Sequence, residues 1–132
     1  IGGEERRITC VDMGNPHCVV FCERVDAVDT ASLGPLFENA PIFPERINTE
    51  FIRVVNRRTI KMRVWERGSG ETMACGTGAC AAVAAAAANG LCDTGCDVSV
   101  RCKGGELIVR CGEEGVTLTG DTRLVYTGEV EY

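Results

Sequence analysis

The sequence predicts a single α+β domain in which a curved, mainly antiparallel sheet wraps around a central alanine-rich helix. Three observations support this prediction. The chain has 132 residues, which is enough for one domain with a core and too few for two ordinary domains. Short segments that alternate apolar and polar residues recur along it, as half-buried strands do. One helical stretch, residues 78–88, is uncharged and apolar on every side, which indicates burial all round.

The first third of the chain predicts two strands and a helix. Residues 8–13 and 17–22 are predicted strands, joined by a turn at residues 14–16. Residues 30–39 are a predicted helix with Asp29 or Thr30 as its N-cap, and the prolines that follow end it. Gly34 and Pro35 lie inside this stretch and disfavour a regular helix there.

The middle of the chain predicts a hairpin from residues 49–55 and 59–66. In its second strand the apolar Ile60, Met62 and Val64 share one face, while Trp65 shares the other face with two basic residues. A glycine-rich loop over residues 66–78 then leads into the central helix. Small side chains all round that helix predict that its neighbours approach closely.

The last third predicts only strands. A hairpin is expected from residues 97–102 and 106–111, with Gly104-Gly105 in its turn. Residues 116–120 and 123–130 are predicted as two further strands.

Charge and hydropathy exclude several classes of protein. The net charge is −5, and the basic residues form no dense run, so neither nucleic acid nor an anionic membrane is an expected partner. The longest small-apolar run, residues 79–88, is too short to span a bilayer.

Nine cysteines are the unusual feature of the composition. A disulfide framework is disfavoured because the number is odd and a chain of this length does not need staples. Zinc is a weak alternative, because the close pairs Cys18/Cys22 and Cys92/Cys96 have C-x3-C spacing and His17 is the only histidine. We expect reduced thiols, mostly buried as small apolar groups, in the cytoplasm, with no bound metal.

Cys75 differs from the other cysteines in its setting. It lies in the glycine-rich turn just before the buried helix, where free N–H groups and the helix dipole are expected to lower its pKa and favour a thiolate. The alternative is a buried structural cysteine. Gly76, Thr77 and Gly78 could direct backbone N–H groups at an anion, or simply permit a tight turn. No lysine follows them, so a nucleotide-binding P-loop is excluded.

Four further residues are candidates for substrate contacts. Arg67 could bind a carboxylate and Glu66 an ammonium group, or the two could form an exposed ion pair. His17 and Asn15 share the first predicted turn, although a lone histidine is usually structural. Asn48 precedes a predicted strand and is unremarkable by itself. An enzyme built from these parts would use thiol acid–base or thiol nucleophile chemistry.

Three stretches, residues 13–19, 48–51 and 64–81, resemble the C-terminal half of diaminopimelate epimerase. The resemblance implies an epimerase that needs neither pyridoxal phosphate nor a metal. It would interconvert LL- and meso-diaminopimelate on the route to bacterial lysine and cell-wall precursors. Members of the family have two similar α+β domains, with the active site between them. Each domain contributes one cysteine, and the two act on opposite faces of one carbon.

The resemblance also implies roles for individual residues. Cys75 would be one of the acid/base pair, and Gly76 and Thr77 would bind the reacting carboxylate. His17 and Glu66 would tune the thiol pKa values. The substrate, its distal amino-acid group in particular, would be held by Asn15, Asn48, Glu66 and Arg67. Tyr126 falls where the family has a tyrosine linked to dimerisation, which implies a homodimer.

Residues 1–132 are accordingly expected to form one epimerase domain without its N-terminal partner domain. About residues 123–132 would be a strand that belongs with that partner, and the chain alone is expected to have little or no activity. Two other interpretations stay open. One is a related cysteine racemase or isomerase, acting on proline, hydroxyproline or a phenazine precursor. The other is a non-catalytic, cysteine-rich zinc or interaction module.

Overall fold

The computed structural model describes all of residues 1–132. It contains eight strands, two α-helices and one 3-10 turn. In chain order these are β1 (Ile8–Asp12), β2 (Pro16–Phe21), η1 (Val25–Ala27), α1 (Thr30–Glu38), β3 (Asn48–Asn56), β4 (Thr59–Glu66), β5 (Gly70–Thr72), α2 (Gly76–Ala88), β6 (Asp97–Cys102), β7 (Gly105–Gly112) and β8 (Gly115–Thr119).

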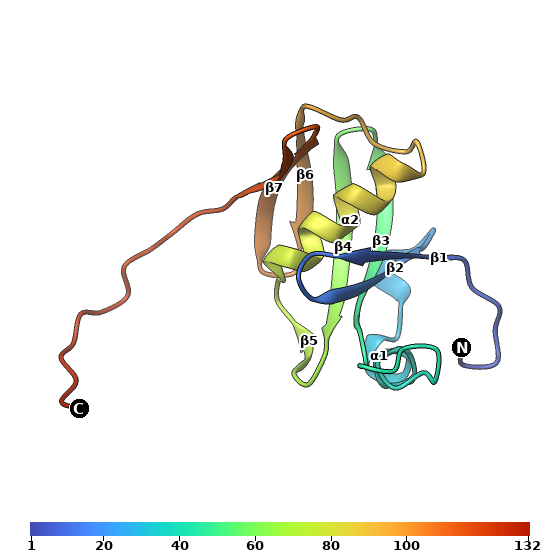
Figure 1. Ribbon diagram of the computed structural model, residues 1–132, viewed down its shortest axis with the longest axis horizontal. Helices are drawn as coiled ribbons and strands as arrows, with labels where there is room; N and C mark the ends of the chain where they lie inside the picture. The colour runs from blue at the N-terminus through green and yellow to red at the C-terminus, as the bar shows by residue number, and fades with distance from the viewer.

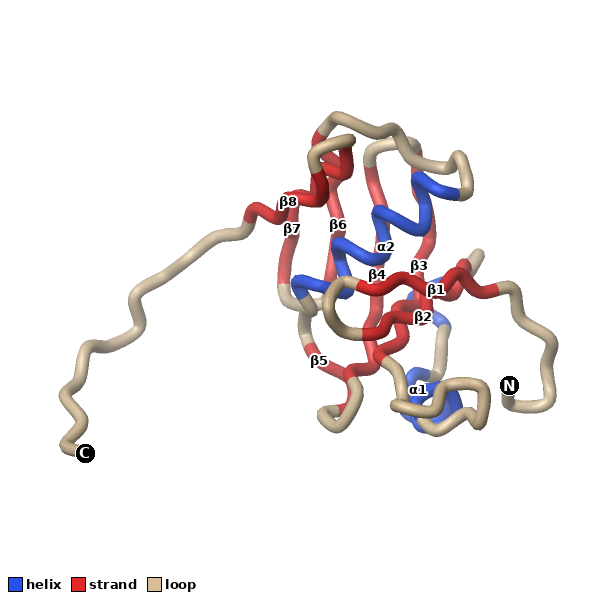
Figure 2. Tube along the Cα trace, viewed as in Figure 1, coloured by secondary structure: helices blue, strands red, loops and turns tan.

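All eight strands belong to one sheet. Its order is β1-β2-β3-β4-β6-β7-β8, with β5 paired to β4. The β2–β3 and β4–β6 pairs are parallel and the others are antiparallel. The sheet curls around α2, which contacts every strand except β5 (Figures 1 and 2). The predicted α+β class, with a mainly antiparallel sheet wrapped around the alanine-rich helix, is confirmed.

Helix α2 occupies the concave side of the sheet and forms the main core. Its alanines pack against the inward-facing side chains of the strands, among them the fully buried Ile52 and Ile60. Because an alanine side chain is a single methyl group, the helix backbone can lie close to the sheet on several sides at once. The helix begins at Gly76, two residues before its predicted start, so Cys75 becomes its N-cap.

Helix α1 covers the opposite face of the sheet, over a smaller core in which Phe37 and Phe51 pack edge to face at 5.6 Å. Asp29 is its N-cap and accepts a hydrogen bond from the Ser32 N–H. Gly34 lies inside this helix because Trp65 packs against it, and a Cβ at Gly34 would sit 2.2 Å from the indole ring. The structure therefore supplies the reason for a glycine in the middle of a helix.

Two predictions along the chain are wrong. The glycine-rich loop contains a short strand, β5, which pairs antiparallel with the end of β4. Residues 123–130 form no strand, and residues 120–132 run away from the domain in an extended course (Figure 1). A strand exists only when a neighbour completes its hydrogen-bond ladder, and this segment has no neighbour within the chain.

The cysteines are also less buried than expected. All nine are free thiols, but only Cys18, Cys80 and Cys92 are buried, and Cys10 is exposed. No group of three His, Cys, Asp or Glu side chains is arranged to hold a metal ion. Neither helix combines the length and the apolar surface that crossing a bilayer requires.

Candidate active site

Cys75 stands at the N-terminus of α2 with its sulfur directed back at the helix. The residue is extended, with φ −138° and ψ 118°, and its Sγ accepts a hydrogen bond from the Gly78 N–H at 3.3 Å. The Thr77 hydroxyl lies 3.6 Å from the same sulfur. The sulfur thus takes the position that a serine or aspartate oxygen takes in an ordinary N-cap.

The pKa of the Cys75 thiol is raised, so the predicted lowering is wrong. Burial is the largest cause, and the negative charge of the nearby Glu66 carboxylate adds to it. Hydrogen bonds from Thr77 and Gly78 act in the expected direction but are outweighed. The prediction considered the helix terminus alone, whereas the fold also removes water from the sulfur and brings two carboxyl groups near it.

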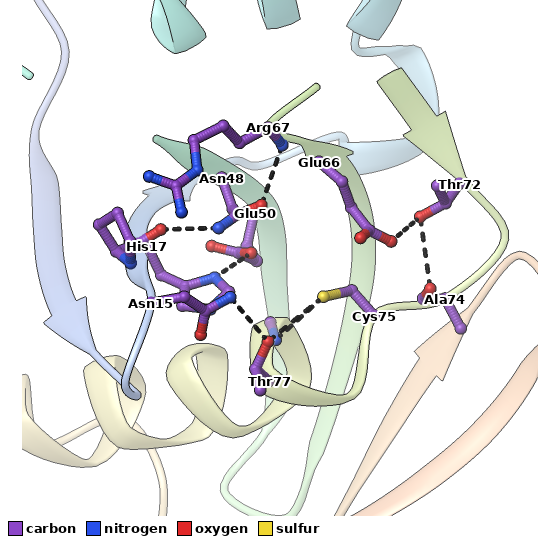
Figure 3. Close-up of polar contacts among 12 residues, drawn as sticks. Asn15, His17, Asn48, Glu50, Glu66, Arg67, Thr72, Ala74, Cys75 and Thr77 are labelled. Atoms are coloured by element: carbon purple, nitrogen blue, oxygen red, sulfur yellow. Dashed lines mark hydrogen bonds and ion pairs between the residues drawn. The ribbon is translucent and has the colours of Figure 1, made fainter. Parts of the chain in front are cut away.

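The β1–β2 hairpin brings Asn15 and His17 to the start of α2. The His17 ring is fully buried, and its Nε2 lies 3.1 Å from Asn15 Oδ1. The Asn15 amide in turn donates from Nδ2 to Thr77 Oγ1 at 3.4 Å. Figure 3 shows this amide between the imidazole and the threonine hydroxyl. His17 therefore reaches Cys75 through two intermediates and does not contact the sulfur itself.

Glu50 is the site residue that the sequence analysis missed. It is fully buried, and its Oε1 lies 2.7 Å from His17 Nδ1. The parallel pairing of β2 with β3 places His17 opposite Asn48, so Glu50 lies two residues further along β3 on the same face. The alternation of side chains along the strand could have identified it. Glu50 lies on the same face as the core residue Ile52, and a carboxylate is unusual on a buried face.

Asn48 joins the two hairpins through its amide. Its Nδ2 donates to the Pro16 carbonyl and its Oδ1 accepts from the Arg67 N–H, both at 2.9 Å. Arg67 forms no ion pair with Glu66; its guanidinium donates to the Glu45 carbonyl at 2.8 Å. The exposed ion pair weighed as an alternative is therefore not formed.

Glu66 has a different partner. Its carboxylate accepts a hydrogen bond from the Thr72 hydroxyl of β5. The short β4–β5 turn that the sequence did not predict is what places Thr72 there. Figure 3 shows the Glu66 carboxylate beside the Cys75 side chain.

Two glycines keep the start of α2 open. A Cβ at Gly78 would lie 2.7 Å from Glu50 Oε1 and 3.2 Å from Cys75 Sγ, and one at Gly76 would lie 2.9 Å from Leu118. Either contact would force neighbours to move. The backbone N–H groups of Gly76 and Thr77 lie in the first helical turn, where the helix supplies no carbonyl partner.

Eight of the nine predicted site residues therefore gather around the start of α2 and the ends of β2, β3 and β4. Tyr126 does not, because it lies in the extended C-terminal segment and is 82% exposed. A cavity of about 420 Å³ opens beside Asn15 and His17, and Cys75 lies outside its lining.

A thiol, the N–H groups of the first turn of α2 and the Glu66 carboxylate thus lie together on a curled-sheet domain. The fold itself recurs in the phenazine biosynthesis protein of the PhzF family from Bacillus anthracis, with a TM-score of 0.59. That likeness has 21% sequence identity and covers 86% of this chain and 38% of that one. It concerns the fold alone.

Sequence comparison gives the family. The family model for diaminopimelate epimerase matches residues 9–132. The diaminopimelate epimerase of Pelotomaculum thermopropionicum is 53% identical over 132 residues, which are 99% of this chain and 46% of that protein. That of Nostoc punctiforme is 49% identical over 98% of this chain and 47% of its own length. The chain belongs to the diaminopimelate epimerase family and spans about half the length of these relatives.

Proposed function

We propose that this chain is the half of a diaminopimelate epimerase that supplies one of its two acid–base cysteines, Cys75. The single observation that carries the proposal is Cys75 as the N-cap of α2, next to the N–H groups of Gly76 and Thr77. A carboxylate bound to those N–H groups places its α-carbon beside the sulfur. The helix terminus then stabilises the charge that develops when the α-proton leaves.

The reaction requires two faces of one carbon. The Cys75 thiolate removes the α-proton from one face, and a thiol on the other face delivers a proton to the resulting carbanion, so that the configuration inverts. The substrate is LL- or meso-diaminopimelate, an intermediate of lysine and cell-wall synthesis in the cytoplasm. Its distal ammonium and carboxylate groups are held by a set of polar residues: Asn15, Asn48, Glu66 and Arg67.

The second face comes from an N-terminal epimerase domain. Residues 123–132 are exposed along their length and carry apolar side chains, which supports their pairing with that domain. Tyr126, in the same segment, contributes to a homodimer interface. The isolated chain then lacks the second thiol, and its epimerase activity is expected to be negligible.

To test this proposal, the chain is joined to the part of a related epimerase that it lacks. We would fuse the part of the Pelotomaculum enzyme that this chain does not match ahead of residue 1, and compare the fusion with the chain alone. Exchange of the substrate α-proton with deuterium from the solvent is followed by NMR. We expect exchange in the fusion, at least a hundredfold less in the chain alone, and loss in a Cys75→Ser fusion. Full exchange by the chain alone would contradict the need for a second face.

A matched control uses a cysteine remote from the site. Cys96 lies in the loop between α2 and β6 and is partly exposed. Cys96→Ser is expected to leave exchange unchanged. If Cys75→Ser and Cys96→Ser behave alike, Cys75 is not the acid–base group.

Offering proline, hydroxyproline or a phenazine precursor to the same fusion tests the related-isomerase alternative. Exchange at proline but not at diaminopimelate would favour that class. Zinc analysis of the reduced protein tests the interaction-module alternative.

A further inference from the structure

A continuous hydrogen-bond chain links a buried carboxyl group to the sulfur of Cys75. Glu50 Oε1 lies 2.7 Å from His17 Nδ1, and His17 Nε2 lies 3.1 Å from Asn15 Oδ1. Asn15 Nδ2 then donates to Thr77 Oγ1, which lies 3.6 Å from Cys75 Sγ. The residues of this hydrogen-bond chain come from four separate segments: β3, β2, the β1–β2 turn and the start of α2 (Figure 3).

The orientation of the Asn15 amide sets the direction of this chain. Its oxygen faces His17, so His17 Nε2 must carry the hydrogen. Its nitrogen donates to Thr77, so the Thr77 hydroxyl hydrogen is free to point at the sulfur. Together with the Gly78 N–H, every donor is then directed toward Cys75, the arrangement that a thiolate requires.

At the other end of this series of hydrogen bonds, the surroundings of Glu50 favour a neutral carboxyl group. Glu50 Oε2 is buried and has no hydrogen-bond partner. An ionised carboxylate would leave a charged oxygen unpaired there, at a much greater cost than a neutral carbonyl oxygen. Burial raises the pKa of Glu50, His17 opposes this rise, and Glu66 adds to it.

The groups that face Glu50 agree with this assignment. They are His17 of β2, Glu66 of β4 and Cys75 before α2. Of these, only His17 can carry a positive charge, and Glu66 is itself negative when ionised. A neutral Glu50 also spares the Cys75 thiolate a second negative neighbour.

We propose that Glu50 is a positioning residue for Cys75: its protonated carboxyl group donates to His17 Nδ1 and holds His17 as the neutral tautomer with hydrogen on Nε2. That tautomer directs the hydrogen-bond chain at the sulfur. The inference rests on the proposed function only in naming Cys75 as the reacting group. The tautomer itself is a property of the folded chain.

The single histidine makes the test direct. The chain is prepared with ¹⁵N in the His17 ring, and proton–nitrogen correlation spectra are recorded at pH 7. We expect a directly bound hydrogen on Nε2 alone, with Nδ1 resonating as an acceptor nitrogen. A hydrogen on Nδ1, alone or together with one on Nε2, would overturn the proposal. Because no turnover is measured, the result is independent of the proposed function.

Two variants test whether Glu50 sets the tautomer. Glu50→Gln retains a donor that can reach Nδ1, so the hydrogen is expected to stay on Nε2. Glu50→Met has similar length and no donor, and is expected to give a mixture of tautomers. An unchanged spectrum in Glu50→Met would show that Glu50 does not hold the ring. If Glu50→Met does not fold, the wild-type and Glu50→Gln spectra still decide.

Discussion

The surroundings of the Cys75 sulfur act on its pKa in opposite directions. Its partial burial favours the thiol, while the Gly78 N–H and the Thr77 hydroxyl favour the thiolate. Glycine at position 78 is needed for this arrangement, because an added Cβ would strike both Glu50 and the sulfur. Alanine would otherwise suit the helix better than glycine by about 1 kcal/mol.

Removing the Thr77 hydroxyl is expected to raise the pKa of Cys75 further. Thr77→Val keeps the shape of the side chain and removes one hydrogen bond that favours the thiolate. A bond of this kind is worth about 1 kcal/mol, so the thiolate fraction below the pKa should fall by roughly five- to tenfold. The measurement is the rate of alkylation of Cys75 between pH 7 and 10, resolved by mass spectrometry.

The control for this prediction is the same substitution at an exposed threonine. Thr94 lies beyond the C-terminal end of α2, far along the chain from the sulfur. Thr94→Val should leave the alkylation profile of Cys75 unchanged. An equal shift in both variants would mean that the Thr77 hydroxyl does not act on the sulfur.

Some residues of the candidate site could be predicted from the sequence and others could not. Cys75 and Asn15 lie in turns with recognisable composition, His17 follows the turn of Asn15 at the start of β2, and the family resemblance covered all three. Glu50 was not identified, because its significance depends on the parallel pairing of β2 with β3, a contact between segments far apart in the sequence. The pKa of Cys75 was misjudged for a related reason, since burial comes from tertiary packing.

At the scale of elements, α1 is positioned by a contact with β4. Trp65 packs on Gly34 and donates from its indole Nε1 to Glu38 Oε2 at 2.7 Å. Glu38 also accepts a hydrogen bond from the Gly68 N–H at 2.8 Å. This buried carboxylate therefore joins the end of α1 to the turn that follows β4, close to Arg67 and the site.

Filling the space at Gly34 is expected to destabilise the protein. Gly34→Ala would place a methyl group inside the Trp65 ring, so α1 or the indole must shift. Overpacking of this kind costs about 1–3 kcal/mol, which outweighs the better helix propensity of alanine. The free energy of unfolding by urea, followed by circular dichroism, gives the value.

Gly112→Ala serves as the matched control. A Cβ there would meet only the Gly95 Cα at 3.8 Å, an ordinary contact. The variant should unfold within about 0.5 kcal/mol of the wild type. A Gly34→Ala variant that is as stable as Gly112→Ala would refute the close packing of Trp65 on α1.

The elements predicted well are those with local causes. The hairpins β3–β4 and β6–β7 follow from alternation flanking turn residues, and α2 from an uncharged run of small apolar residues, mostly alanine. The elements predicted poorly depend on a partner elsewhere. Strand β5 exists because it pairs with β4, and residues 123–130 form no strand because nothing pairs with them.

At the scale of the whole molecule, the sheet is an open half-barrel. Its edges are β1 and β8, and the chain leaves β8 as an extended segment. Helix α2 fills the curve of the sheet, and its N-terminal end lies near β7 and β8 (Figure 1). The candidate site therefore lies at the N-terminal end of the helix that forms the main core.

Stability is expected to fall at alkaline pH because the fold buries thiols. Six cysteines have pKa values raised above the ordinary 9.0, and that of Cys102 reaches about 11, chiefly through burial. A group whose pKa is raised by folding stabilises fully below its unfolded pKa and loses that contribution as pH rises through the folded value. The free energy of unfolding should therefore decline between pH 9 and 11.

Urea unfolding under reducing conditions at pH 7.5, 9, 10 and 11 measures this decline. Cys102→Ala removes one of the responsible groups and should make the decline shallower, although its stability at pH 7.5 is also expected to fall through lost packing. A free energy that is constant from pH 9 to 11 in the wild type would contradict the assignment of buried thiols.

The contact between Trp65 and α1 has a further use. Trp65 is the only tryptophan in the chain, and Glu66 follows it directly. Its indole is held by Gly34 and Glu38 on one side of the sheet while its neighbour in sequence lies at the site. The tryptophan fluorescence of this protein, excited selectively over that of its two tyrosines, therefore comes from one place. The emission of Trp65 should report whether α1 is packed against β4. Because Glu66 is the next residue, the same emission should also respond to a ligand bound at Glu66.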